Sequence, residues 1–320
     1  MINGRYKILA IDGGGVRGII PARILQYFEE TAKKPISCLF DMIVGTSTGG
    51  LIALGLTAPA NTNPLKTPKY TAKDIVNFYL DHSKDIFPQS FFTNFKSGFD
   101  LWSAKYSRTG LDKTLVKLFG NNFLHDALIP VLIPSYSLID NSPTLFTSLR
   151  SFHDESIYLM SDIAGSATAA PTYFAPKVFV DNLGKSHMQI DGGIFANNPE
   201  ELGIGFAMDK NADLKREKID VISIGTGAPI LKIPKSFGIL GWLSKGNLFD
   251  VMLNAGSILS DKEVHMTTHG AHRFQMNITQ GEDSLDNSSP EHLECLLKAI
   301  NYVIANDSAE FETVVKSLLS

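Results

Sequence analysis

The chain has 320 residues, with 29 Lys plus Arg, 33 Asp plus Glu and a formal net charge of -4. This length suits one large α/β domain with extensions, and the weakly negative charge gives no general attraction to nucleic acid or to anionic membranes. The two cysteines, Cys38 and Cys295, make neither a disulfide framework nor a spaced metal motif, so we expect both to be small buried apolar residues.

No targeting or membrane-spanning segment stands out in the sequence. Residues 1–11 lack the ordered charged, apolar and small-residue regions of a secretory signal peptide. No apolar run approaches the roughly 18 residues that a membrane-spanning helix requires. We therefore expect a protein of the cytoplasm or of a membrane surface, while delivery into a host cell by a leaderless route stays open.

The first predicted element is a buried strand over residues 6–11, which are apolar and end at Asp12. A glycine-rich turn follows, Gly13-Gly14-Gly15-Val16-Arg17-Gly18, and a helical pattern of apolar residues continues to Glu30. Backbone amides at the start of a helix carry partial positive charge and can stabilise a phosphate or an oxyanion. This turn therefore predicts an anion-binding loop.

A second buried strand is predicted over residues 39–44, and a helix over residues 51–56. Between them lies Gly45-Thr46-Ser47-Thr48-Gly49, which fits the GxSxG nucleophile elbow, a strained turn that raises a serine hydroxyl above a sheet. Ser47 is therefore a candidate nucleophile for acyl transfer. The order strand, helix, strand, helix predicts a parallel sheet with helices on its faces.

The middle of the chain begins with an aromatic stretch over residues 87–106. It is either a satellite hydrophobic cluster or the wall of a pocket for an acyl chain. Two strands around a polar turn are predicted over residues 131–138 and 143–147. We expect helix to resume near Ser156.

Two more glycine-bearing turns follow predicted strands. A strand over residues 188–190 leads into Asp191-Gly192-Gly193, and a strand over residues 220–224 ends at a Gly-Thr-Gly turn. We expect both strands to run parallel to the first two. Asn197 and Asn198 are expected to cap the helix that follows them.

The last ninety residues carry fewer motifs. Residues 237–243 are apolar and flanked by lysines, which predicts either a loop at a lipid interface or ordinary packing. Helices are predicted from Ser289 and from Ser308. We expect residues 1–230 to form a catalytic core and residues 231–320 a mostly helical C-terminal extension packed on the same domain.

Four sequence blocks together carry a resemblance to a known family. They are Asp12-Gly13-Gly14-Gly15-Val16-Arg17-Gly18, Gly45-Thr46-Ser47-Thr48-Gly49, Ser166-Ala167-Thr168-Ala169-Ala170-Pro171-Thr172-Tyr173-Phe174, and Asp191-Gly192-Gly193 followed by Phe195-Ala196-Asn197-Asn198-Pro199. In this order and at this separation they resemble the patatin-like phospholipases. The resemblance covers roughly residues 8–227. It implies a three-layer α/β/α fold with a mostly parallel central sheet, a nucleophile elbow and C-terminal helices.

The resemblance also implies a reaction. Ser47 would attack an acyl ester and Asp191 would be the general base, in a Ser-Asp dyad that needs no essential histidine, metal or organic cofactor. The oxyanion hole would come from Gly13, Gly14 and Gly15, with Arg17 shaping the loop or adding positive charge. The supporting positions are Asp12, Gly18, Gly45, Gly49, Gly192 and Gly193.

The expected function is hydrolysis of a lipid ester of the phospholipase A or lysophospholipase type. We expect a membrane or lipid-aggregate surface as partner and no nucleic acid, and a need for a protein activator stays open. Three alternatives remain: an acyltransferase on the same scaffold, a catalytically silent lipid-binding module, and a sugar kinase or ATPase of the actin-like fold. The last would explain the glycine-rich turn but not the elbow.

Overall fold

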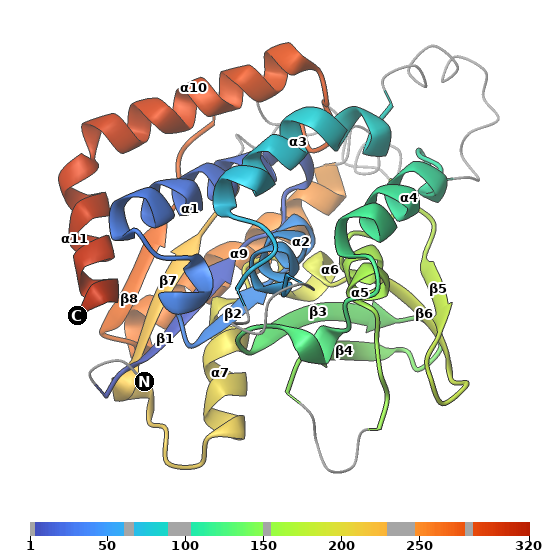
Figure 1. Ribbon diagram of the computed structural model, residues 1–320, viewed down its shortest axis with the longest axis horizontal. Helices are drawn as coiled ribbons and strands as arrows, with labels where there is room; N and C mark the ends of the chain where they lie inside the picture. Colours follow the sequence, from blue (N-terminus) through green and yellow to red (C-terminus); the bar gives the residue numbers. More distant parts are fainter. Residues whose placement is uncertain (1–3, 61–66, 89–103, 150–154, 229–246, 279–283) are drawn as a thin grey trace.

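Eight strands form one central sheet in this computed structural model, which describes residues 4–60, 67–88, 104–149, 155–228, 247–278 and 284–320 (Figure 1). The strands are β1 (Tyr6–Ile11), β2 (Met42–Gly45), β3 (Val131–Ser137), β4 (Ser142–Thr147), β5 (Lys177–Val180), β6 (Ser186–Asp191), β7 (Ile219–Ile224) and β8 (Gly270–Phe274). Their order is β5-β6-β3-β2-β1-β7-β8, with β4 beside β3. The pairs β3–β2, β2–β1, β1–β7 and β7–β8 are parallel, whereas β3–β4, β3–β6 and β6–β5 are antiparallel.

Helices cover both faces of this sheet. They are α1 (Ile19–Ala32), α2 (Thr48–Thr57), α3 (Ala72–Ile86), α4 (Arg108–Phe119), α5 (Met160–Ala167), α6 (Gly193–Ala196), α7 (Glu200–Lys210), α9 (Asn247–Thr267), α10 (Pro290–Asn306) and α11 (Ser308–Leu319). Short 3-10 turns are η1 (Gly15–Gly18), η2 (Ile36–Cys38), η5 (Leu124–Asp126) and η6 (Arg216–Lys218).

Alternate residues of β1 show why the fold has three layers. Leu9 and Ile11 belong to a buried cluster with residues of α1, α2, α3 and α10. Ile8 and Ala10 point the other way and belong to a second cluster, which includes Ile204 of α7. A strand buried on both faces is the normal state inside a parallel sheet. The predicted α/β/α layering and mostly parallel sheet are confirmed.

The prediction that β6 is a parallel strand was wrong. A connection of only five residues joins β5 to β6, so the two strands form an antiparallel hairpin. One edge of β3 is occupied by β4 along residues 132–137, so β6 must lie on the edge that β3 shares with β2. On that edge β2 pairs with residues 131–132 and β6 with residues 135–137. The two strands therefore meet end to end, which brings Gly45 and Asp191 close.

Helix does not resume at Ser156, because the backbone there is bound to partners outside any helix. The amide of Ile157 donates to the Asn182 side chain, and the carbonyl of Tyr158 accepts from the amide of Leu124 at 2.8 Å. Helix α5 begins only at Met160. The helices predicted from Ser289 and Ser308 are confirmed, and the Ser289 hydroxyl accepts a capping hydrogen bond from His292.

The C-terminal residues contribute more than helices. Strand β8 extends the sheet beside β7, while α10 and α11 contribute Leu293 and Phe311 to the cluster around α1. The sequence did not predict β8, because Gly270-Ala271-His272-Arg273-Phe274 carries charged and small residues with little alternation. The predictions for residues 237–243 and for most of the aromatic stretch lie outside the described residues.

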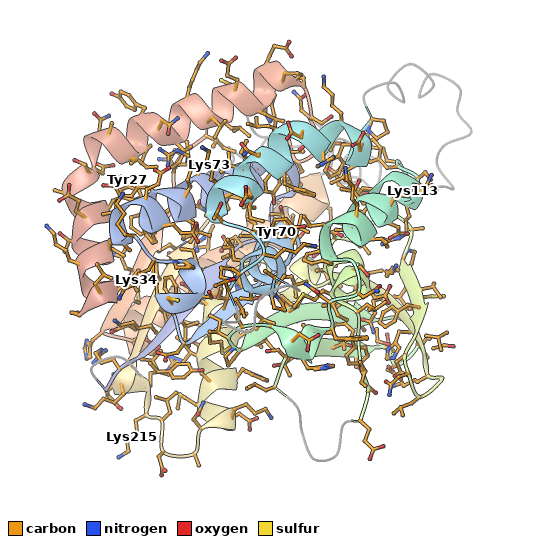
Figure 2. The ribbon with its side chains drawn as sticks, viewed as in Figure 1. Tyr27, Lys34, Tyr70, Lys73, Lys113 and Lys215 are labelled. Atoms are coloured by element: carbon orange, nitrogen blue, oxygen red, sulfur yellow. The ribbon has the colours of Figure 1, made fainter. Side chains whose placement is uncertain are left out.

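The surface differs from the sequence analysis in one respect. Cys38 and Cys295 are both exposed, so the prediction that they are buried was wrong. Lys34, Lys73 and Lys113, which are labelled in Figure 2, are exposed at separate places in the chain. Within the described ranges, no helix is long and apolar enough to cross a membrane.

Candidate active site

Ser47 lies on a strained turn between β2 and α2. Its φ of 54° and ψ of -123° place it in a backbone region that residues with side chains rarely adopt. The amide of Gly49 donates to the carbonyl of Thr46 at 2.7 Å, and a side chain on Gly49 would collide with the backbone of Ile11. The backbone can therefore make this sharp turn only with small residues at the positions the elbow pattern predicts.

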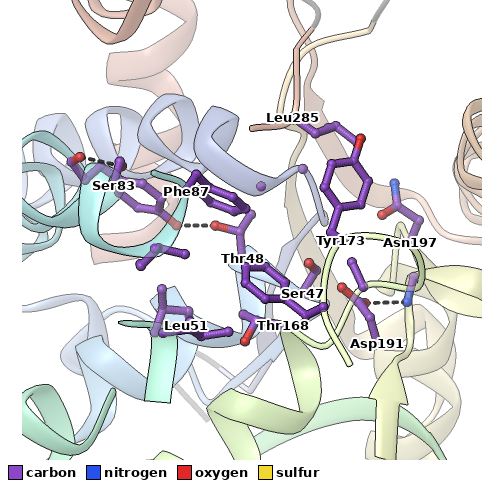
Figure 3. Close-up of a pocket in the computed structure, with 18 of the residues that line it drawn as sticks. Ser47, Thr48, Leu51, Ser83, Phe87, Thr168, Tyr173, Asp191, Asn197 and Leu285 are labelled. Carbon is purple, nitrogen blue, oxygen red and sulfur yellow. Dashed lines mark hydrogen bonds between the residues drawn. The ribbon is translucent and has the colours of Figure 1, made fainter. Parts of the chain in front are cut away.

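Asp191 ends β6 beside this elbow. Its amide donates to the carbonyl of Ala169 at 3.0 Å, and its Oδ1 accepts from the amide of Gly193 at 2.8 Å. The residue is 4% exposed. Burial raises the pKa of Asp191 to about 7, although hydrogen bonds from the Ser47 hydroxyl and the Gly193 amide oppose the rise. Ser47 and Asp191 lie side by side in Figure 3.

The glycine-rich turn lies against the same elbow, but its amides are not equivalent. Gly13 differs from our expectation, because its amide donates to the carbonyl of Asn197 at 3.1 Å and is not available to a substrate. Gly14 and Gly15 both line the pocket next to Ser47, and in the described part of the chain no hydrogen bond engages their amides. The candidate anion donors are therefore Gly14 and Gly15.

Arg17 is 5% exposed and is not among the residues that line the pocket. Its amide donates to the carbonyl of Gly14 at 3.1 Å, which closes the turn η1. Gly18 packs where a side chain would collide with Thr48 and Tyr79. Arg17 and Gly18 therefore shape the glycine-rich turn and hold it against α2 and α3.

Asp12 forms a buried ion pair that the sequence did not predict. Arg273 of β8 donates to both of its carboxylate oxygens, at 3.1 Å and 2.6 Å, and also to Ser223 Oγ at 2.6 Å. The two side chains are 8% and 3% exposed. Burial lowers the pKa of Arg273, but the carboxylates of Asp12, Glu200 and Asp261 together outweigh it and the net direction is upward. Asp12 is therefore an anchor for the glycine-rich turn.

One pocket contains Ser47, Asp191 and the two candidate anion donors. Its space, including the part open to solvent, is about 780 Å³, and its lining includes Gly14, Gly15, Ser47, Thr48 and Asp191. The apolar side chains of the lining include Leu51, Phe78, Ile86, Phe87, Leu111 and Phe174. An apolar cavity with polar groups gathered at one end is suited to a ligand with a hydrocarbon chain and a polar head.

Comparison with known proteins now identifies the family. A family model described as Patatin-like phospholipase matches residues 9–204. The chain belongs to this family. Patatin-like protein 2 from Oryza sativa subsp. indica is 32% identical over 335 residues, covering 91% of this chain and 82% of that protein. A relative from Solanum tuberosum, named Probable inactive patatin-3-Kuras 1, is 33% identical over 282 residues, covering 79% and 72%.

Among solved structures, VipD from Legionella pneumophila superposes over 93% of this chain and 67% of that one. The TM-score is 0.35 and the identity 12%, so the patatin-like assignment rests on sequence. The actin-like alternative is wrong. It requires a hairpin strand after the glycine-rich turn, whereas this patatin-like chain forms α1 there and pairs β1 in parallel with β2.

Sequence reasoning missed the residues that tie the turns of this patatin-like site together. Thr46 Oγ1 donates to the carbonyl of Ala196 at 2.5 Å, and Thr226 Oγ1 donates to the carbonyl of Gly13 at 2.8 Å. Asn197 was expected to cap a helix, but it lines the pocket and donates to Ser257 Oγ at 2.9 Å. The glycines on both sides of Thr226 were the available signal, because they mark a crowded turn after a parallel strand.

Proposed function

We propose that this protein is a lipid acyl hydrolase in which Ser47 is the nucleophile and Asp191 the general base. The observation that carries the proposal is the pairing of a strained serine with a carboxyl group whose pKa is raised to about 7. A base is most effective when its pKa lies near the working pH. The apolar pocket and membership of the patatin-like phospholipase family support a lipid ester as substrate.

In the first half of the reaction, Asp191 accepts the proton of Ser47 Oγ as that oxygen bonds to the ester carbonyl carbon. The carbonyl electron pair moves to the oxygen, which accepts hydrogen bonds from the amides of Gly14 and Gly15. The amide of Thr48, next to the nucleophile, is the position that elbow enzymes add to such a hole. The carbon–oxygen ester bond then breaks, and the leaving alcohol takes the proton from Asp191.

In the second half, Asp191 accepts a proton from water as the water oxygen bonds to the acyl carbon of acyl-Ser47. The bond to Ser47 Oγ breaks, the proton returns to that oxygen, and a fatty acid leaves. Because Asp191 is active only when ionised, the rate rises with pH through about 7 and is level above it.

The test uses mixed lipid vesicles and three proteins: the wild type, Ser47→Ala and Asp191→Asn. We expect both variants to lose nearly all release of fatty acid and lysolipid, and removal of the general base in Asp191→Asn alone should slow it roughly 10²–10⁴-fold. A fluorophosphonate probe should label the wild type and Cys38→Ala, whose substitution removes an exposed thiol, but not Ser47→Ala. Release by Asp191→Asn at the wild-type rate would contradict the dyad.

The products of the vesicle experiment distinguish the hydrolase from two alternatives. An acyltransferase would pass the acyl group from Ser47 to an added alcohol or lysolipid in preference to water, because only the second half of the reaction differs. A silent lipid-binding module would bind the vesicles without releasing fatty acid. The second alternative is relevant because one relative is named as probably inactive.

We propose a membrane or lipid-aggregate surface as the place of action, and residues 1–230 as the catalytic core.

A further inference from the structure

Helix α3 forms the wall of the pocket on the side away from Asp191 (Figure 3). Figure 3 shows Asp191 and Ser47 on one side of the pocket, Thr48 between them and α3, and Ser83 on the opposite side. Phe78, Tyr79, Ser83 and Ile86 of α3 all belong to the lining. An acyl chain attached to Ser47 would therefore extend towards α3.

Ser83 is the smallest of these four side chains. It is 3% exposed, and its hydroxyl donates to the carbonyl of Tyr79, one turn earlier, at 2.5 Å. The hydroxyl is thus satisfied within the helix, as is common for serines that face an apolar environment. The hydroxyl therefore needs no hydrogen bond from a ligand. The side chain affects the pocket only through its small size, which leaves space empty.

The α3 wall is held in place by its neighbours. The Tyr79 hydroxyl is hydrogen-bonded to Thr48 Oγ1 of α2, and Gly18 packs against the hydroxyl end of the Tyr79 side chain. Gly110 of α4 lies so close to the Asp85 carbonyl of α3 that a side chain there would collide with it. Because α3 is fixed against both helices, a larger residue at position 83 would fill the cavity and could not push the wall outward.

We propose that Ser83 sets the length of the acyl chain that the pocket accepts. This inference rests on the proposed function, because it assumes that the acyl group is attached to Ser47. The space beside Ser83 holds the terminal carbons of a long chain. A larger side chain at this position excludes long chains and leaves short ones unaffected, since these do not reach the space beside Ser83.

The experiment measures kcat/KM for butyrate, octanoate and palmitate esters with the variants Ser83→Val, Ser83→Leu and Ser83→Phe. We expect the palmitate-to-butyrate ratio to fall in the order of added volume, by at least about tenfold for Ser83→Phe, since a single methylene in an apolar pocket changes discrimination by about 10–200-fold. The matched control is Asp81→Leu, which adds an apolar side chain to the exposed face of the same helix and should leave the ratio unchanged.

An equal fall for all three esters, or an unchanged ratio in folded Ser83→Phe, would overturn the proposal. Ser83→Val adds little volume, so it preserves the test where a larger residue prevents folding. If the wild type hydrolyses none of the esters, the proposed function fails. The inference is then judged by calorimetry with free palmitate and octanoate, in which Ser83→Phe should lose palmitate binding selectively and equal binding would refute it.

Discussion

Two regions contribute to this site in different ways. One is the set of turns that contain the candidate reacting groups, and the other is the C-terminal residues 247–320. Ser47, Thr48, Asp191 and the glycine-rich turn supply every group assigned to a chemical step. Residues 247–320 supply none of these groups, yet they contact the glycine-rich turn and the turn after Asp191. Arg273 binds Asp12, the carbonyl of Leu285 accepts from Val16 at 2.9 Å, and Ser257 accepts from Asn197.

The difference follows from the demands placed on each region. A strained elbow or an open anion hole needs particular small residues, so it leaves a local pattern in the sequence. Holding such a turn in place needs only a donor or acceptor at the correct point in space, and many sequences can provide one. If this comparison is right, substitutions in the first region should change the reaction, and substitutions in the second should change stability first.

The largest effect is expected for Arg273→Met. This change leaves the Asp12 carboxylate buried without its bidentate partner. Breaking a buried ion pair by removing one partner costs about 3–5 kcal/mol. Urea denaturation should show a loss of this size in the free energy of unfolding. The double variant Asp12→Asn/Arg273→Met should be more stable than Arg273→Met, because it removes the buried Asp12 charge and leaves only Asp261 and Glu200 without the guanidinium.

The control for Arg273 is a more exposed pair between Arg5 and Asp220, with an oxygen–nitrogen distance of 2.7 Å and side chains 36% and 28% exposed. Arg5→Met should cost less than about 1 kcal/mol, because solvent screens such pairs. Equal losses for Arg5→Met and Arg273→Met would mean that the C-terminal region anchors the glycine-rich turn no more firmly than an ordinary surface contact does.

The second prediction concerns Asp191→Asn, which should raise stability while it abolishes the reaction. The carboxyl group keeps its proton up to a pH of about 7 in the folded state, but loses it near its usual pKa of 3.8 when unfolded. The unfolded state therefore binds fewer protons between these values, and the wild type loses stability as the pH rises from about 4 to about 7. Asparagine does not ionise and can still accept the hydrogen bond from Gly193.

At pH 8 the variant should be more stable than the wild type by at most roughly 4 kcal/mol, from about 1.4 kcal/mol per pKa unit. Thermal unfolding at pH 5 and pH 8 measures the change, and the advantage of Asp191→Asn should be larger at pH 8. An advantage that is the same at both values would show that the Asp191 carboxyl is not desolvated, and would remove the basis for its raised pKa.

How much could be predicted depended on whether the information was local. The elbow at Ser47 and the capped start of α10 were predicted correctly, because neighbouring residues determine each of them. The direction of β6 was not predicted correctly. The residues of a strand do not indicate whether its neighbour runs parallel or antiparallel to it, and only the pairing with β3 fixes the direction. The amide of Gly13 was assigned to the oxyanion hole because its partner, the carbonyl of Asn197, is distant in sequence and has no side-chain signature.

The third prediction tests the contact between Gly15 and the C-terminal region. Gly15 has a φ of 57°, and a side chain there would collide with the carbonyl of Leu285. Gly120 has the same φ with nothing nearby, so Gly120→Ala measures the backbone strain alone, about 1–3 kcal/mol. Gly15→Ala should cost more than Gly120→Ala in urea denaturation, and only Gly15→Ala should lower kcat. A normal kcat for folded Gly15→Ala would mean that this turn does not form part of the oxyanion hole.

The smallest effect is expected for Ser257→Ala in α9. This change removes the hydroxyl that accepts a hydrogen bond from Asn197, a cost of about 1 kcal/mol, and frees the Asn197 side chain at the edge of the pocket. We expect kcat to fall a few-fold while the pH dependence stays the same, because Asp191 keeps its own partners. Ser260→Ala is the control, since its hydroxyl lies one turn further along α9 and accepts from Glu201 of α7 at 3.4 Å. A fall in kcat of the same size in both variants would mean that α9 acts on the site through its general packing, and that the contact between Ser257 and Asn197 has no special role.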